Sequence, residues 1–417
     1  MNISFLMLVP LIYCGASDIV RPEMFGAKGD GLFDDAPALN KCLSAGCTIE
    51  LSKGKTYLLK TAVQPIPFDT FRLDGRGSRI IVDSSYPLGK YDHIFRFADG
   101  SKRRRSFVIT DIEALYLPGQ KFPDKDDIGD SYFIFIDNCE SVRIDRVNLE
   151  SESLYNNLTF FASFGLGRLT MRNCHVKINT LSKQGGCFWL INQYFESSSI
   201  EISHCVFEQD TQDETACFSA MELHGVQSSS ITGTIKDCVF RSPCKSPSSG
   251  FLMAYNHYPA KANIHLEFRR CCFLATGENS RKIMSYQIGD DPAYPYATMS
   301  TSFINCDMQF VFAKEYETGL LCHPFLSQAP SENYLFSFKR CRFTMKNIHP
   351  LIGDKDGDKE GCYAFWNCSY VADKEPFVKR FNIQTSELYL IVNGKKTKYG
   401  ITQDKIISEV YENSAGK

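Results

Sequence analysis

The chain of 417 residues has little tryptophan and almost no net charge, and both shortages exclude classes of protein. Its 46 Lys and Arg nearly balance its 48 Asp and Glu, so no basic field indicates nucleic-acid binding. The one basic run, SKRRRS at 101–106, is interpreted as a solvated loop. Two Trp stand beside 32 Phe and 28 Gly, a composition that favours short strands and turns over long helices.

No phosphate-binding motif is present near the start, although glycines are frequent there. The glycines of MFGAKGDGLFDDAPALNKCL (24–43) have the spacing of neither a Walker loop nor a dinucleotide fingerprint. The aspartates among them would repel a phosphate. Asp34 or Asp35 can instead cap a helix that has Pro37 in its first turn and an apolar stripe after it. This pattern predicts a short amphipathic helix at 35–45.

The seventeen cysteines follow neither a metal-binding nor a disulfide pattern. Their number is odd, the chain is too long for a disulfide-stapled mini-domain, and no Cys-x-x-Cys or paired Cys/His spacing occurs. Instead, the pattern apolar-x-apolar-x-x-Cys-x-apolar recurs eight times, with Val147 replacing Cys in the first copy. Successive copies are 27, 31, 33, 33, 35, 35 and 27 residues apart. The seven cysteines are Cys174, Cys205, Cys238, Cys271, Cys306, Cys341 and Cys368.

Such self-similarity predicts a stack of repeated units. Each unit has a period-2 run, a polar corner residue such as Asn173 or Asp237, and a second period-2 run. We therefore predict an all-β fold, a right-handed parallel β-helix (solenoid) with an N-terminal capping helix and a small C-terminal cap. Its cysteines should be buried, unbridged and in register on coils about 4.8 Å apart. Of the adjacent Cys271 and Cys272, one should point inward and the other away.

The stretch FGAKGDGLFDD (25–35) resembles the opening motif of the pectate-lyase-superfamily right-handed β-helix proteins. That family usually has Thr where Ala36 stands, and TIELSKGKTYLL (48–59) and LDGRGSRIIVD (73–83) are similar to its first turns. The resemblance implies the fold but no particular reaction. The same motif precedes polysaccharide lyases, glycoside hydrolases and phage tail-spike proteins.

The chain is expected to have four parts. Residues 1–17 are apolar, too short to span a bilayer, and could be a signal peptide or a virion-attachment segment. Residues 18–70 would form the N-terminal cap and first coil, and 71–372 the β-helix. The repeat is expected to stop after Phe377, and 373–417 to form a C-terminal cap with a hairpin around Asn393 and Gly394 and a helix at 401–413.

The catalytic sets of polygalacturonase-like hydrolases are absent or in the wrong order. The acidic runs at 123–130 and 354–361 match a calcium-ligand pattern only loosely and are interpreted as solvated turns. We therefore expect no metal and no cofactor. A better candidate comes from aligning the second strand of successive coils, CFWLINQY (187–194), CFSAMELH (217–224) and GFLMAYNH (250–257), without gaps.

In this alignment, Asn192, Glu222 and Tyr255 stack in one column, and Tyr194, His224 and His257 stack two positions further on. Alternation puts both columns on one face. Asp290 and Asp291 follow the strand of the next coil. The predicted catalytic residues are Glu222, His224, His257 and Tyr255. The predicted substrate-binding residues are Asn192, Tyr194, Asp290 and Asp291.

Converging His, Glu, Tyr and Asp side chains suit acid–base cleavage of a polysaccharide, by a lyase or a glycoside hydrolase. Such an enzyme would be secreted or carried on a virion tail, and a tail-spike-like protein would be expected to form a homotrimer. The alternative is a non-catalytic β-helix, either a structural phage tail protein or a glycan-binding adhesin. Polar columns of this kind also form sheet surfaces and sugar-binding grooves without catalysis.

Overall fold

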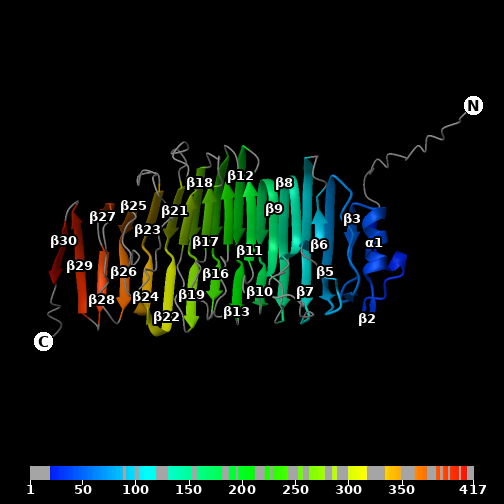
Figure 1. The fold of residues 1–417 in the computed structure, drawn as a ribbon, viewed down its shortest axis with the longest axis horizontal. Coiled ribbons are helices and arrows are strands. Elements are labelled where there is room, and N and C mark those ends of the chain that lie inside the picture. Colours follow the sequence, from blue (N-terminus) through cyan, green and yellow to red (C-terminus); the bar gives the residue numbers. More distant parts are fainter. Residues whose placement is uncertain are drawn as a thin grey trace, which may run out of the picture.

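The structure is a computed structural model, and it shows one elongated stack of β-coils with a helix at its N-terminal end (Figure 1). The described residues are 19–87, 91–98, 103–118, 130–152, 157–180, 187–193, 196–211, 221–225, 229–242, 252–256, 263–277, 284–288, 299–316, 334–348, 362–372, 382–385, 388–392, 395–402 and 405–410. Within them, no helix is long and apolar enough to cross a membrane.

Neighbouring coils pair in parallel, and their strands form three ladders that we name sheets A, B and C. Four long strands pass through more than one sheet: β5 (Thr70–Val82), β7 (Arg104–Tyr116), β8 (Asp130–Ser151) and β9 (Asn157–Arg172). Within a complete coil the chain runs through sheet C, then A, then B. The predicted parallel β-helix is therefore confirmed.

Sheet A contains the strand that precedes the turn from sheet A to sheet B in each coil. Besides parts of the long strands it comprises β1 (Ile19–Val20), β3 (Thr48–Glu50), β12 (Ser197–Ser203), β15 (Ser230–Lys236), β18 (Asn263–Arg269), β21 (Met299–Ile304), β23 (Tyr334–Lys339), β25 (Cys362–Trp366) and β27 (Asn382–Thr385).

Sheet B contains the strand that follows the turn from sheet A to sheet B in each coil. Besides the ends of β5, β7 and β8 it comprises β2 (Asp30–Asp34), β4 (Thr56–Leu59), β10 (His175–Thr180), β13 (Val206–Thr211), β16 (Val239–Ser242), β19 (Cys272–Gly277), β22 (Asp307–Tyr316), β24 (Arg342–Ile348), β26 (Cys368–Ala372) and β28 (Leu388–Val392).

Sheet C closes the middle coils. It comprises β6 (Tyr91–Phe97), the first parts of β8 and β9, β11 (Cys187–Gln193), β14 (Met221–Gly225), β17 (Leu252–Asn256) and β20 (Met284–Ile288).

The N-terminal cap consists of η1 (Pro22–Phe25) and α1 (Ala36–Ala45), which confirms the predicted helix at 35–45. Both aspartates before the helix contribute. The carboxylate of Asp34 accepts the N–H of Ala36 at 3.2 Å. Asp35 is fully buried and accepts the N–H groups of Lys28 and Gly29 at 2.7 and 3.1 Å, which closes the glycine-rich turn. Burial raises the pKa of the Asp35 carboxyl, although these donors oppose the shift.

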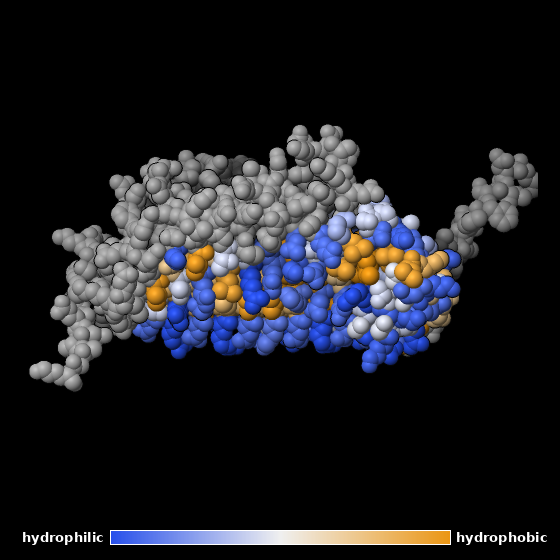
Figure 2. Space-filling view, turned by 90° about the horizontal axis from the view of Figure 1, so that it is seen from below, coloured by the Kyte–Doolittle hydropathy of each residue, from blue (hydrophilic) through white to orange (hydrophobic). Residues whose placement is uncertain are grey.

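Most of the outer surface is hydrophilic where Figure 2 shows it, with hydrophobic residues gathered in a few areas. Among the described residues, the exposed large hydrophobic side chains are those of Ile19, Met24, Leu32, Phe33 and Val311. Four of these five lie within residues 19–33, at the N-terminal end of the stack. The described outer surface of the coils therefore consists mainly of polar side chains.

The corner between sheets A and B is made by one residue in the left-handed conformation. From Arg146 onward this residue directly precedes the ladder cysteine or its replacement Val147, as in Asn173 before Cys174 and Asp237 before Cys238. Left-handed backbone costs about 1–2 kcal/mol for residues other than glycine. Ion pairs between coils offset part of this cost: Arg270 forms two 2.7 Å contacts with Asp237 of the preceding coil.

The cysteine ladder is buried and unbridged, as predicted. All seven predicted cysteines are free and at most 2% exposed, and Cys139 of the corner between sheets C and A is buried too. Backbone bonds fix the register: the carbonyl of Cys205 accepts the N–H of Val239, and that of Cys238 the N–H of Cys272, each at 2.9 Å. Cys271 is buried and Cys272 only partly so, which confirms their opposite orientation.

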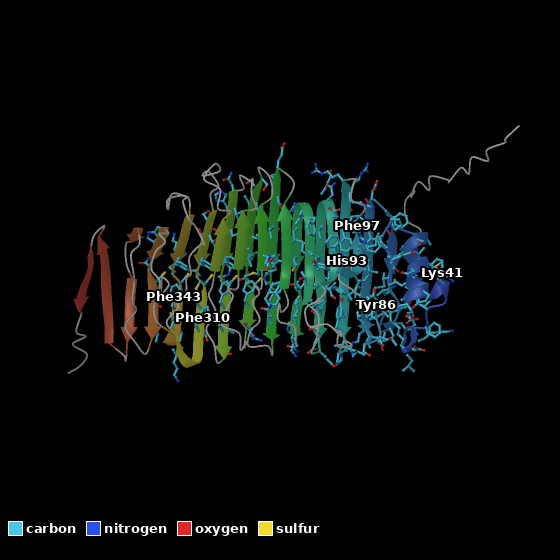
Figure 3. All side chains as sticks on the ribbon, in the orientation of Figure 1. Lys41, Tyr86, His93, Phe97, Phe310 and Phe343 are labelled. Atoms are coloured by element: carbon cyan, nitrogen blue, oxygen red, sulfur yellow. The ribbon has the colours of Figure 1, made fainter. Side chains whose placement is uncertain are left out.

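Rows of phenylalanine fill the interior beside the cysteines. Phe303 stacks on Phe268 at 5.1 Å and on Phe338 at 4.9 Å between ring centroids, one ring from each of three successive coils. Figure 3 shows Phe310 and Phe343, which are both fully buried interior residues of sheet B. Stacked rings of this kind add packing energy beyond the apolar area that they bury.

The C-terminal end differs from the prediction. Parallel stacking continues past residue 377, because β27 pairs with β25 and β28 with β26. The predicted hairpin is confirmed, since β28 pairs antiparallel with β29 (Lys395–Thr402). The predicted helix at 401–413 is wrong: β30 (Lys405–Val410) is a strand paired antiparallel with β29. These strands satisfy backbone groups that the edge of the last coil would otherwise expose.

Candidate functional site

The candidate residues whose backbone is described lie on three neighbouring strands of sheet C. Asn192 belongs to β11, Glu222 and His224 belong to β14, and Tyr255 belongs to β17. Parallel pairing puts Asn192 beside His224, and His224 beside Tyr255. Asn192, His224 and Tyr255 therefore form one column across three coils, and the prediction that Asn192 and Tyr255 share a column is confirmed.

The position predicted for Glu222 in that column is wrong. Glu222 pairs with Leu190 on one side and Met253 on the other, two residues along the strand from the expected partners. The gapless alignment matched the Cys-Phe pairs that begin two of the segments, whereas the paired strands are offset by two residues at β14. Because side chains alternate, an offset of two leaves the face unchanged.

Burial identifies the face that Glu222 occupies. Met221 and Leu223 on either side are buried in the core, whereas Glu222 is partly exposed. Glu222 therefore lies on the outer face of sheet C, and His224, two residues on, occupies a position on the same face. Two of the predicted catalytic positions thus share one strand and one face.

Four further candidates cannot be placed against this column. Tyr194, His257, Asp290 and Asp291 lie outside the described residues. The second predicted column, of Tyr194, His224 and His257, is not supported at its centre, because the partner of His224 on β17 is Tyr255.

An aromatic cluster that the sequence reasoning missed lies on the same sheet, toward the N-terminus. The ring of His93 on β6 lies 5.2 Å from that of Tyr132 and 4.5 Å from that of Phe135, and Phe135 lies 5.4 Å from Phe164 (Figure 3 labels His93). Phe135 and Phe164 are partly exposed. Burial, and to a smaller degree Arg96, lowers the pKa of His93 to about 4.

The register joins this cluster to the polar column. Phe164 pairs with Asn192, and so belongs to the column that continues through His224 and Tyr255. Phe135 belongs to the neighbouring column, which reaches Glu222 through Ala162 and Leu190. The alternation in DSYFIFID (130–137) was the signal that could have revealed an outward aromatic position.

Metal binding finds no support among the residues that the structure describes, where no group of three or more His, Cys, Asp or Glu could hold an ion.

The outer face of sheet B is occupied by paired charges. Lys177 contacts Glu150 at 2.6 Å, and Arg241 contacts Glu208 at 2.9 Å. Such pairs fit a solvated sheet surface.

No family model matches the chain, and no curated protein matches it either. The solved structures similar to it include ORF18 of Geobacillus virus E2, at 13% identity and a TM-score of 0.43, over 90% of this chain and 61% of that one. Another is PfbA, a surface adhesin of Streptococcus pneumoniae, at 12% identity and 0.43, over 95% and 99%.

A third similar structure is the phiAB6 tailspike in complex with oligosaccharides of an Acinetobacter baumannii surface polysaccharide. It is 12% identical with a TM-score of 0.35, over 96% of this chain and 59% of that one. The chain thus spans about three fifths of the length of the two viral proteins. Likeness at this level assigns no function. The fold defines the class of the protein: it is a parallel β-helix, and one of its sheets has both aromatic and polar residues at outward positions.

Proposed function

We propose that the protein binds a polysaccharide along the outer face of sheet C and cleaves it there. One observation carries the proposal: Phe164, Asn192, His224 and Tyr255 occupy one column on four successive coils, with Glu222 in the next column of the same face. A glycan lying along the solenoid axis would meet a side chain of this column about every 4.8 Å. Aromatic rings offer flat apolar surfaces to sugar rings, and the polar side chains offer hydrogen bonds to hydroxyls.

Cleavage would rest on Glu222 and His224. A carboxylate and an imidazole on one face can act as a proton donor and acceptor pair at the glycosidic oxygen or at the carbon next to a uronate. A hydrolase needs a second carboxyl, for which Asp290 and Asp291 are the candidates. Tyr255 and His257 would assist the proton transfer. Asn192 and Tyr194 would hold the sugar.

Free thiols favour one of the two proposed places of action. Eleven cysteines are free among the described residues, and those of the ladder lie in register on adjacent coils. Disulfides form and persist in oxidising compartments, so a chain exported unfolded would risk bridging these neighbours. This supports a protein that folds in a reducing compartment and reaches the outside on a virion tail, where a homotrimer would be expected.

The test compares Glu222→Gln and His224→Ala with the parent protein on a panel of polysaccharides. New reducing ends report hydrolysis, and the ultraviolet absorbance of unsaturated uronates reports a lyase. Each substitution should reduce turnover by about a hundredfold or more while the melting temperature barely changes. Glu152→Gln is the control, because Glu152 is an exposed carboxylate next to the outer face of sheet B.

Three results are informative. Loss of turnover in both variants would support cleavage of the glycan at Glu222 and His224. Reduced affinity in both variants, with no turnover in the parent, supports a glycan-binding protein without catalysis. If both variants bind and cleave like the parent, the site lies elsewhere on the molecule.

A further inference from the structure

A second polar groove lies on the outer face of sheet A, and none of its lining residues is a candidate residue of sheet C. Its volume is about 540 Å³. Small-molecule sites commonly have about 300–1,000 Å³. The groove crosses the strands β9, β12, β15, β18 and β21, and all of its lining residues are described.

Two outward columns form the groove. The first column consists of Arg168, Ser199, Thr232, His265 and Ser300, paired in register from coil to coil. Five coils correspond to about 19 Å along the axis at about 4.8 Å per spacing. The second column contains Glu201, Thr234, Glu267 and Ser302. In the second column, carboxylates alternate with hydroxyl-bearing side chains.

Short side chains keep the groove open between the two carboxylates. Thr234 separates Glu201 from Glu267, and Thr232 separates Ser199 from His265. Below them, the inward position of β15 is Gly233, where an added Cβ would lie 2.7 Å from the side chain of Leu266. The sequence therefore places glycine where the floor of the groove packs closely against Leu266 of the next coil.

Among the residues that line the groove, the charges of Arg168 and Lys236 balance those of Glu201 and Glu267. The carboxylate of Glu201 contacts Arg172 at 2.8 Å, and Arg168 and Lys236 at 3.8 Å each. Glu267 pairs with Arg269. The cations are thus already engaged by carboxylates, and an anionic polymer would meet two of these carboxylates without a free cluster of positive charge.

Groups that bind hydroxyls are abundant here by contrast. Carboxylates held by cations remain strong hydrogen-bond acceptors for neutral donors. His265 Nδ1 lies 2.7 Å from Ser300 Oγ, which orients both side chains. The Ser337 hydroxyl donates to Ser302 Oγ at 2.7 Å and fixes the end of the second column. The result is a row of hydrogen-bond donors and acceptors across five successive coils.

We infer that this groove binds a neutral, hydroxyl-rich oligosaccharide that lies along the solenoid axis. The inference does not depend on the function proposed for sheet C, because the two surfaces share no residue. The protein would then hold a glycan at two faces, one of which performs no chemistry.

The experiment blocks the groove with Thr234→Trp, since an outward Trp is well tolerated on a sheet surface. Thr344→Trp is the matched control, because Thr344 occupies a partly exposed outward position in β24 of sheet B. The full chain is titrated with maltohexaose, mannohexaose and N-acetylchitohexaose as neutral probes, and with hexagalacturonate as the anionic probe. Binding is measured by calorimetry and by saturation-transfer NMR.

At least one neutral hexasaccharide should bind the parent and Thr344→Trp alike, and Thr234→Trp should weaken it at least about tenfold. Glu267→Gln should weaken it by a smaller factor, which excludes a purely steric effect of the Trp. The inference is overturned if no neutral probe binds the parent, if Thr234→Trp binds as the parent does, or if only hexagalacturonate depends on Thr234. Binding lost with Glu222→Gln and unchanged by Thr234→Trp would assign the glycan to sheet C alone.

Discussion

Replacing Gly167 with alanine should disrupt the contact between two adjacent coils. Gly167 lies in β9, between Leu166 and Arg168, which pair with Cys139 and Ser141 of β8. A Cβ at this position would lie 2.5 Å from the carbonyl oxygen of Glu140. That separation is about 1 Å shorter than the roughly 3.5 Å at which non-bonded atoms attract one another.

The atom in the way belongs to the backbone and is held by the pairing on both sides. Relief would require the two coils to move apart or β9 to twist locally, either of which weakens neighbouring hydrogen bonds. Overpacking of this kind typically costs about 1–3 kcal/mol, so we expect the free energy of unfolding to fall by about 3 kcal/mol, at the upper end of that range, where the backbone itself must move.

Gly54→Ala provides the control, since it separates steric clash from backbone strain. Gly54 has φ of +72° and no atom within 4 Å of an added Cβ. Its replacement should cost only the left-handed strain of about 1 kcal/mol. Urea unfolding of both variants, with midpoint and slope fitted together, gives the comparison. If Gly167→Ala is no more destabilised than Gly54→Ala, the coils are not packed as closely as the structure indicates.

Three other properties can be checked in the same way. The ladder thiols should resist modification in the native protein and react once unfolded, and Cys238→Ser should cost only about 1 kcal/mol, since the Lys236 carbonyl that accepts from the thiol at 3.2 Å can accept from the hydroxyl. His93 is held neutral, so stability should fall as pH drops from about 6.5 to about 4. After allowance for solvent screening, the loss should be about 1–2 kcal/mol, and it should be absent in His93→Phe. Arg270 holds the pKa of Asp237 below its usual range, so Arg270→Ala should raise that pKa toward 3.8 in an NMR titration.

The interior of the solenoid could be predicted from the sequence because each corner repeats a local conformation. One left-handed residue, such as Asn173 or His204, turns the chain from sheet A to sheet B and leaves the next residue, a cysteine, pointing inward. The polar residue before each cysteine therefore fixes the register of both flanking strands. That constraint made the buried ladder and the parallel stacking predictable.

The last strands were harder to predict, because their pattern is compatible with two structures. Residues 401–413 alternate polar and apolar side chains only in part, and the segment could form an amphipathic helix when considered alone. The segment forms strands because the last coil would otherwise leave backbone groups unpaired at its edge, and a strand can pair with these groups whereas a helix cannot. β29 therefore pairs with β28, and β30 with β29.

The corner between sheets A and B does not fix the register of sheet C. Lys177 and Glu208 are partners in sheet B, whereas the residues beside each other in sheet C are Asn192 and His224. The connection therefore lengthens from 15 residues (192 − 177) to 16 (224 − 208) between adjacent coils. The strand must accommodate the added residue before it pairs.

Burial limits how that accommodation can occur. A slip of one residue in β14 would turn Met221 and Leu223 outward and bury Glu222, so the alternation of the sequence excludes it. A slip of two residues leaves every buried side chain buried. The face of Glu222 and His224 was therefore predictable from alternation, whereas their column partners depend on the length and path of the preceding connection. For this reason, the sequence of a β-helix predicts the face of a candidate residue more reliably than its partners in a column. Substitutions at Glu222 and His224 therefore test the outer face of sheet C and do not depend on which residues pair with them.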